Sequence, residues 1–297
     1  MGIRAMKRKT ATLWLLLALV ACTAMAAQAG NRSAVRKTVE SSMLVTGMID
    51  IEPDGTVSGH RLDKPEKLTP VLREYIGKTT AAMRFEAPIL VDGKLVRVRT
   101  KMSLWLIANK QDNGDYQLRL GGASFGDPST LPKEETTSVR GKLLPPRYPR
   151  VAHMSNITGI VYLVLKIGKQ GTVEDVMVEQ TNLTVLGTSK QMEAGRKMLE
   201  KASIAAAKQW MFTVPVRGEA AKNPYWVVRA PVEFLIGYPG KKTSDQSDWR
   251  AYVPGPRQRI PWISEEENRH SLEALTAGVV HPIGYGPKLV SSLDAGS

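Results

Sequence analysis

The stretch from Leu143 to Gly237 constrains the fold more than any other part of the chain. An unbroken apolar run over residues 159–167 is followed by the turn Gly168-Lys-Gln-Gly171 and by a second run over residues 172–180. One face of the first run is wholly apolar and the other is mostly so, which is typical of a buried strand. A short turn that contains glycine joins two such strands into a hairpin. The segment therefore predicts a hairpin inside a small sheet.

A helix and a third strand follow this hairpin. Thr188 and Gln191 stand three residues apart and form a capping box, which marks a helix start. Met192, Leu199 and Ala206 recur every seven residues and give the predicted helix one thin apolar stripe. The strand, strand, helix, strand order predicts an α+β fold, in which one helix packs on a small antiparallel sheet.

Several short motifs in this stretch occur in a recognisable order. They are Tyr148-Pro149-x-x-Ala152, Gly159-x-Val161, Gly171-x-Val173 and Trp210-x-Phe212. In this order they resemble the C-terminal domain of TonB-family energy transducers, over about one third of the chain. The chain departs from the family in one place, because Pro215 falls one residue later than the proline of the family's Trp-x-Phe-x-Pro pattern.

The resemblance implies a periplasmic protein-binding module whose partner is an outer-membrane TonB-dependent transporter. In the family, the region that corresponds to Tyr148 and Pro149 lies near the contact with the transporter. The anchor of the energised family members has a Ser-x-x-x-His pattern, and the leader of this chain holds no histidine. We therefore do not infer from the resemblance that this chain transduces energy.

The last strand of such a sheet is an edge to which an extended partner segment can add. The predicted edges are 226–236 in the second module and 96–107 in the first. Pro231 lacks an N–H group, so it suits an edge strand but removes one pairing position. The partner-binding side chains predicted on the second edge are Trp226, Val228, Val232 and Phe234.

Residues 42–107 repeat the plan of the organising stretch. Gly55 stands in the place of Gly171, and Thr69-Pro70 opens a helix. Residues 83–88 align with 210–215, and Val98-Arg99 aligns with Val228-Arg229. This self-similarity predicts a tandem duplication, with modules at 30–126 and 143–238 joined by a linker at 127–142. The alternative is two unrelated units that share generic turn chemistry.

The remaining segment, residues 239–297, is predicted to be a partly ordered tail. Ser264 begins a capping box with acids in the first turn, so a short helix is predicted over residues 264–277. From Val279 onward, glycine and proline recur every few residues, which predicts a loose end.

The first 29 residues have the basic, apolar and small-residue regions of a secretory leader. Leu19-Val20-Ala21-Cys22 resembles a bacterial lipobox, which predicts lipid attachment at Cys22 and, with Thr23 next, an outer-membrane location. Cleavage after Ala29, which gives a soluble periplasmic protein, is one alternative. An uncleaved inner-membrane anchor over residues 13–29 is the other, although it is at the short limit for a spanning helix.

The formal net charge of +13 is spread along the chain as single Lys and Arg residues. Without the four basic residues of the leader it is 13 − 4 = +9. No nucleic-acid motif is present, so the charge fits a solvated surface or attraction to anionic polymer. The second function considered is therefore a structural envelope protein that binds cell-wall polymer or lipid through its basic surface. The sequence does not give the oligomeric state.

No catalytic or metal-binding pattern is found. His60, His153, His270 and His281 lie in unrelated segments without a metal-ligand spacing. Ser189-Lys190 is adjacent rather than at Ser-x-x-Lys spacing, and Asp54 fits a turn former better than a base. The chain is predicted not to be an enzyme and to hold no metal or cofactor.

Overall fold

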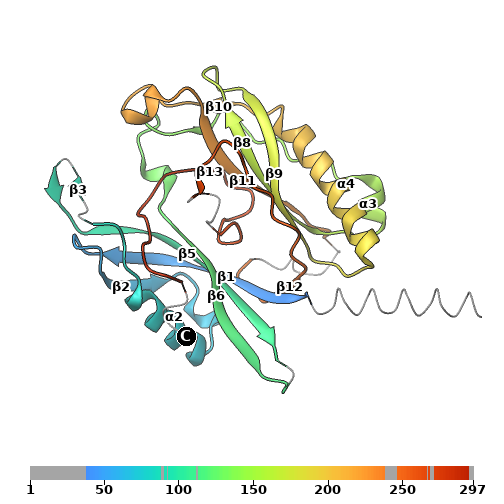
Figure 1. The fold of residues 1–297 in the computed structure, drawn as a ribbon, viewed down its shortest axis with the longest axis horizontal. Helices are drawn as coiled ribbons and strands as arrows, with labels where there is room; N and C mark the ends of the chain where they lie inside the picture. Colours follow the sequence, from blue (N-terminus) through green and yellow to red (C-terminus); the bar gives the residue numbers. More distant parts are fainter. Residues whose placement is uncertain are drawn as a thin grey trace, which may run out of the picture.

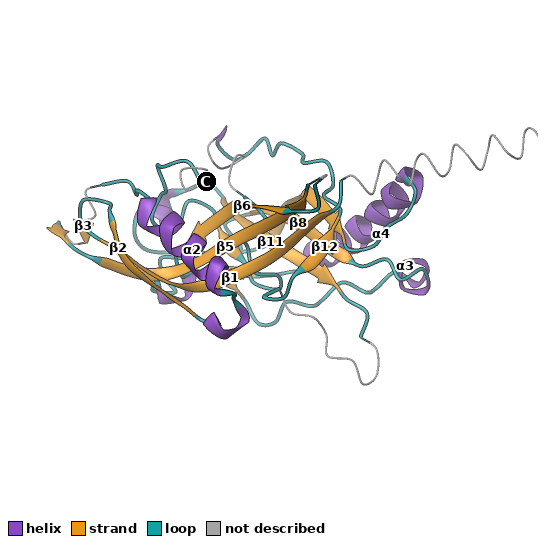
Figure 2. Ribbon diagram, turned by 90° about the horizontal axis from the view of Figure 1, so that it is seen from below, coloured by secondary structure: helices purple, strands orange, loops and turns teal. Residues whose placement is uncertain are grey.

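Two antiparallel sheets, each with a helix, make up the body of the protein (Figure 1). The computed structural model describes residues 38–87, 90–91, 93–111, 113–237, 246–265, 267 and 271–293. The predicted leader with Cys22, and also Pro88 and His270, lie outside the described residues. Figure 2 shows the strands of both sheets slanting across the middle of the molecule, with α3 and α4 at the end opposite β3.

The helices are α2 (Pro70–Ala82), α3 (Arg150–Met154) and α4 (Ser189–Ala207), with 3-10 turns at Pro65–Lys67, Pro128–Thr130 and Glu219–Lys222. The strands are β1 (Glu40–Ile51), β2 (Val57–Leu62), β3 (Leu90–Val91), β4 (Lys94–Leu95), β5 (Val98–Lys110), β6 (Tyr116–Phe125), β7 (Ser138–Val139), β8 (Gly159–Ile167), β9 (Val173–Leu183), β10 (Phe212–Thr213), β11 (Trp226–Phe234), β12 (Arg250–Tyr252) and β13 (His281–Pro282).

The first sheet has the order β12-β1-β5-β6, and β2 also pairs with β1. The second sheet has the order β13-β11-β8-β9. In both sheets the first strand of the module lies in the middle, between the strand that follows the turn and the strand that follows the helix. This is the predicted α+β class, with the strand, strand, helix, strand order in both halves.

The turns after β1 and β8 have the same geometry. Gly55 and Gly171 both adopt a positive φ, 83° and 76°. The Phe85 N–H donates to Gly55 O at 2.8 Å, and the Phe212 N–H donates to Gly171 O at 2.8 Å. A Cβ on either glycine would lie 2.2 Å from Phe85 O or 1.9 Å from Phe212 O. Both positions therefore require glycine, for its φ and for the close approach of the next strand.

The registers of the two sheets also correspond. Each has an irregularity in the hairpin pairing just before Ile51 or Ile167. On the other side, Ile51 pairs with Val98 and Ile167 pairs with Trp226. Val98 is therefore the structural counterpart of Trp226. The sequence alignment of Val98 with Val228 was wrong by two residues, because a strand's alternating pattern looks the same after a shift of two.

Each module has its own core, which lies between the sheet and its helix. In the first, Ile76 of α2 packs on strand residues that include Ile49, Ile51, Leu104 and Leu106. In the second, the fully buried side chains include Val161, Leu163, Leu165, Leu199 and Phe212. Burial of each such aliphatic side chain stabilises the fold by about 1.5–3 kcal/mol.

The tail is an integral part of both sheets. It contributes β12 to the first sheet and β13 to the second. Leu272 is fully buried against Ile160 and Tyr162 of β8. The expectation of a loose end from Val279 onward was wrong, because the pairing partners that order the tail lie far away in the sequence.

The last described residues return to the first module. The Glu86 N–H donates to Lys288 O at 2.9 Å, and the Val290 N–H donates to Arg84 O at 2.8 Å. Of the helix predicted over residues 264–277, Glu265 and Glu267 are helical, and the Ser264 hydroxyl accepts from the Glu267 N–H at 3.1 Å. Residues 271–277 form turns instead.

Candidate functional site

The outer side of β11 is where the sequence predicts a partner strand. In the structure, β11 pairs with β8 on its inner side from Trp226 to Phe234. On its outer side it pairs with β13, with Val228 opposite Pro282 and Arg229 opposite His281. The expectation that this edge is unoccupied was therefore wrong. An antiparallel strand from the chain's own tail already occupies part of it.

Two hydrogen bonds flank this short ladder. The Ile283 N–H donates to Val227 O at 3.0 Å, and the Gly278 N–H donates to Pro231 O at 2.9 Å. Pro231 can accept but cannot donate, and here it does accept. The proline on β11 is thus compatible with an added strand, and the tail shows one way in which a strand meets it.

The prediction that residues 96–107 form the edge strand of the first module was also wrong. β5 lies inside its sheet, because it pairs with β1 from Val98 to Ala108 and with β6 from Met102 to Lys110. β6 arises from a hairpin after β5, so the first module supplies its own fourth strand. Among the described residues, β6 is the outermost strand on that side of the first sheet.

The side chains predicted to contact a partner on β11 point into the core. Trp226, Val228, Val232 and Phe234 are between 0% and 8% exposed. An added strand would contact the backbone of β11, and of these four side chains only Trp226 lines the groove at the end of β13. Their predicted role in partner binding stays a prediction.

Tyr148 and Pro149 form the lead-in to the second module. The Tyr148 hydroxyl donates to Ile157 O at 2.6 Å. Its ring meets Phe234 edge-on with a centroid distance of 5.2 Å, and His153 at 5.3 Å. Pro149 is the N-cap residue of α3. The pair holds α3 against the end of β11, and its proximity to a partner stays a prediction.

The tail covers the other edge of the second sheet as well. Leu183 of β9 and Val253 exchange two backbone hydrogen bonds, of 3.1 and 2.7 Å. Further along, the Gln258 N–H donates to Glu179 O at 2.7 Å. The second sheet therefore has tail segments along both of its outer strands.

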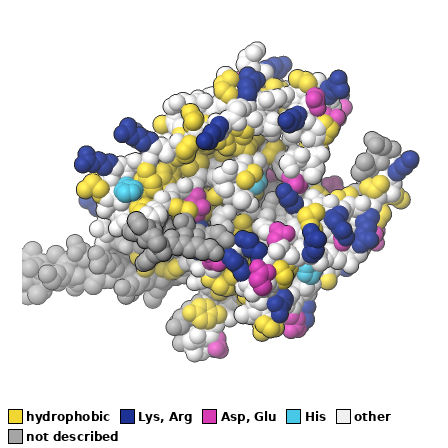
Figure 3. Space-filling model, turned by 180° about the vertical axis from the view of Figure 1, so that it is seen from behind, with side chains coloured by type: hydrophobic (Ala, Val, Ile, Leu, Met, Phe, Trp, Pro, Cys, Tyr) yellow, Lys and Arg dark blue, Asp and Glu magenta, His cyan; other side chains and the backbone are white. Residues whose placement is uncertain are grey.

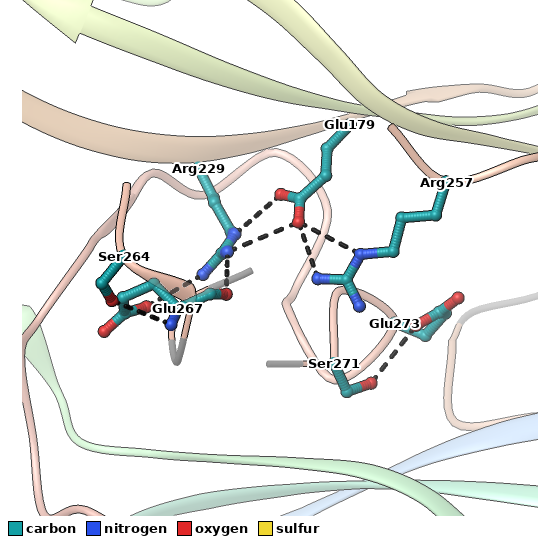
Figure 4. Close-up of polar contacts among 7 residues, drawn as sticks. All are labelled: Glu179, Arg229, Arg257, Ser264, Glu267, Ser271 and Glu273. Carbon is teal, nitrogen blue, oxygen red and sulfur yellow. Dashed lines mark hydrogen bonds and ion pairs between the residues drawn. The ribbon is translucent and has the colours of Figure 1, made fainter. Parts of the chain in front are cut away.

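A buried ion network fastens the tail to the second sheet (Figure 4). The side chain of Glu179 is fully buried and accepts from Arg229 Nε at 2.9 Å and from Arg257 Nη2 at 2.7 Å. Arg229 also pairs with Glu267, at 3.3 Å. The network joins β9, β11 and two tail segments. The network was not predicted from the sequence, where the available signal was a charged residue directly after a valine in each strand, Glu179 in β9 and Arg229 in β11.

A groove opens where β13 ends. Its volume is about 560 Å³, which lies within the range of ligand and peptide sites. The carboxylates of Glu135 and Glu267 lie among its walls, and no Lys or Arg of the described chain lines it. Its aromatic lining consists of Tyr225, Trp226, Trp262 and Tyr285.

His281 is the titratable group of β13. Burial lowers the pKa of its imidazole, and the nearby Arg229 lowers it further, while the hydrogen bond from Nε2 to Thr276 O opposes these effects. The distance between Nε2 and Thr276 O is 3.0 Å. His281 therefore favours the neutral form while the strand is docked.

Metal and catalytic chemistry find little support in the described part of the chain. No group of three or more His, Cys, Asp or Glu residues there could hold a metal ion. Asp54 accepts from the Thr56 N–H at 2.9 Å, as a turn former does. Ser189 is the first residue of α4. Within the described ranges, no helix is both long and apolar enough to cross a membrane.

Comparison with known proteins identifies the second module. Residues 145–236 match the family model of the Gram-negative bacterial TonB protein C-terminal domain. The matched segment runs from α3 to β11, and the first module lies outside it. No curated protein and no solved structure matched the chain. The match supports a TonB-family role in the cell envelope, in a family of non-enzymatic protein-interaction domains whose partners are outer-membrane transporters.

Proposed function

We propose that this chain is a membrane-tethered, periplasmic protein-binding module that pairs the outer edge of β11 with an extended segment of an outer-membrane transporter. The observation that carries the proposal is β13, because it shows that this edge accepts an antiparallel strand. The family match over residues 145–236 supports the kind of partner.

The pairing between β13 and β11 is short enough for a partner segment to replace β13. β13 forms two residue pairs with β11, whereas β8 forms nine with the same strand. Main-chain hydrogen bonds give an added strand its affinity, so a longer partner segment would gain more pairs than β13 makes. A segment that followed the path of β13 would leave β11 at Val227 and enter the groove there.

A reversible lock on β13 tests this. Val228 and Pro282 face each other between flanking hydrogen-bonded pairs, which is the closer kind of antiparallel pair and suits a disulfide. The double variant Val228→Cys, Pro282→Cys would be made with Cys22→Ala. We expect the reduced form to cross-link through β11 to a periplasmic segment of an outer-membrane protein, and the oxidised form to lose this cross-link.

Two controls accompany the lock. The Cys22→Ala chain alone passes through the same oxidation and reduction, and a cross-linker at exposed Lys197 on α4 reports contacts away from the edge. Equal cross-linking by the oxidised and reduced forms would show that the partner does not replace β13. A partner found only from α4 would reject the β11 site.

We also propose that the tether is a lipid on Cys22, which lies outside the described residues. The lipobox residues 19–22 support it. Intact mass and membrane fractionation, with Cys22→Ala beside the unchanged chain, would test it. We expect a lipid-bearing chain that begins at Cys22 and is lost in the variant. A chain that begins at Gly30, or an uncleaved chain in the inner membrane, would replace this proposal.

A further inference from the structure

The solvent side of α4 carries a row of lysines. Its buried side holds Met192 and Leu199, which pack on the second sheet. Opposite them, exposed lysines follow at intervals of seven, four and seven residues, which at 3.6 residues per turn places them on one side of the helix. They are Lys190, Lys197, Lys201 and Lys208.

Exposed apolar side chains lie on the neighbouring helix. In α3, Val151 and Met154 are 63% and 71% exposed, whereas Ala152 between them is fully buried. The first two stand three residues apart, so they share one side of the helix. Just after α3, Ile157 lies against α4, where it would be 3.2 Å from a Cβ at Gly195. Single exposed apolar residues are ordinary, but these two stand on a helix that lies beside α4.

The start of α3 is basic as well. Arg147 precedes this helix and Arg150 is its first residue, and both are exposed. The carboxylates of α4 are engaged: Glu193 pairs with Lys197 at 2.6 Å, and Glu200 accepts from the Thr181 hydroxyl at 2.8 Å.

The lysine row also borders an apolar hollow. A shallow depression of about 450 Å³ lies along α4. Ile204 and Ala205 form its apolar part, and Lys197, Lys201 and Lys208 line it with Glu200. Cations placed around a small apolar surface are the composition of protein faces that lie on a membrane.

The length of chain between the predicted leader and β1 limits how far this face can lie from the membrane. The predicted leader ends at Ala29, and residues 30–37 reach at most about 29 Å when extended. If Cys22 carries the lipid, residues 23–37 reach at most about 54 Å. Val39 at the start of β1 packs against the core of the second module. In Figures 1 and 2, β1 begins on the side of the molecule where α3 and α4 lie.

We propose that the exposed sides of α3 and α4 form a docking face for the anionic lipid headgroups of the membrane that holds the leader. The lysines and arginines attract the headgroups over roughly one Debye length. Val151 and Met154 then enter the boundary between headgroups and acyl chains. Docking at this face is separate from strand pairing at β11, so either can fail without the other.

A label at Met154 would report this docking in the full chain. With Cys22→Ser, the single cysteine of Met154→Cys carries an environment-sensitive fluorophore, and the chain is placed in vesicles with or without phosphatidylglycerol. We expect a quencher in the lipid phase to quench the label in anionic vesicles at low salt, and less so at high salt. The matched site is Val71→Cys on α2, which is 72% exposed and should remain unquenched.

A charge reversal separates specific docking from general attraction. Lys197 and Lys78 are 70% and 71% exposed, and each pairs with a glutamate one turn earlier in its helix, at 2.6 and 2.7 Å. We expect Lys197→Glu to lower the equilibrium constant for docking to anionic vesicles on the order of tenfold, and Lys78→Glu to leave this constant nearly unchanged. Equal quenching at positions 154 and 71, equal effects of the two reversals, or a response only to added cell-wall polymer would overturn the proposal.

Discussion

In both sheets, a glycine at positive φ closes the turn between the first two strands, and the strand after the helix returns to the first strand in the same register. Gly55 and Gly171 hold the same place, and so do Ile51 and Ile167. The α2 and α4 helices both begin at a capping threonine. The shared positions are those where backbone geometry leaves little choice of residue.

The outer edges differ. In the first sheet, β6 follows β5 in a hairpin and pairs with it from Met102 to Lys110. In the second, β13 is the only strand that the described residues place on the corresponding side of β11, and it comes from a tail almost fifty residues further along the chain. The β5–β6 hairpin has nine residue pairs to lose, whereas β13 has two, so β13 is the easier strand to replace. The difference favours the second sheet as the one that takes a partner.

The largest expected difference between the sheets lies in their ion pairs. Glu179→Gln would leave Arg229 and Arg257 without their shared carboxylate in a buried site, which should cost about 3 kcal/mol of unfolding free energy. Asp50→Asn in the first sheet removes a pair with Arg99, whose side chain is 68% exposed, and should cost less than about 1 kcal/mol. Urea unfolding of both variants would measure this. Equal losses would mean that the network does not fasten the tail.

The turns should instead behave alike. Gly171→Ala and Gly55→Ala each place a Cβ against a backbone oxygen and force a strained positive φ, so each should cost about 2–3 kcal/mol. Gly93→Ala is the matched control, since its φ is 73° but its Cβ would meet nothing within 4 Å. If Gly55→Ala were as mild as this control while Gly171→Ala were severe, the proposed duplication would lose its main structural support.

Much of the second module could be predicted from the sequence, because its signals are local. The predicted run at 159–167 is β8, and the helix predicted from Thr188 is α4, with both hydrogen bonds of its capping box present. Apolar continuity and capping act between residues that are close in the chain. For the same reason, the strand, strand, helix, strand order of both modules could be inferred.

The edges could not be predicted in this way. Val253 and Gly278 join the second sheet through partners that no local pattern announces. β6 fills the edge of the first module that was assigned to a partner. Glu179 follows Val178 in β9, but nothing local points to its partner Arg257, which lies in a segment that was expected to be at most partly ordered.

The helix caps should show a smaller difference between the modules. Thr69 accepts from the Leu72 N–H at 3.3 Å, and Thr188 accepts from the Gln191 N–H at the same distance. Only in α4 does a side chain return the bond, because Gln191 accepts from the Thr188 N–H at 2.9 Å. Each Thr→Ala variant should cost about 1 kcal/mol, with Thr188→Ala the costlier. Thermal unfolding measures both, and the reverse order would contradict the added value of the capping box.

The smallest expected effect is a pH dependence of the pairing between β13 and β11. The pKa of His281 is lowered in the docked strand, so the undocked tail binds a proton more readily than the docked one. Its contribution to docking is therefore complete above the ordinary histidine pKa of about 6.5 and is lost as the pH falls below it. Hydrogen exchange of the Gly278 and Ile283 amides should become faster between about pH 7 and 5, after correction for the intrinsic rate. The His281→Gln variant should lose this acceleration.

The pKa of His60 in the first sheet is also lowered by burial, so acid should loosen β2 as well but leave the β5–β6 pairing unchanged. Equal acid sensitivity of β6 and β13 would show that His281 does not control the strand at the partner edge.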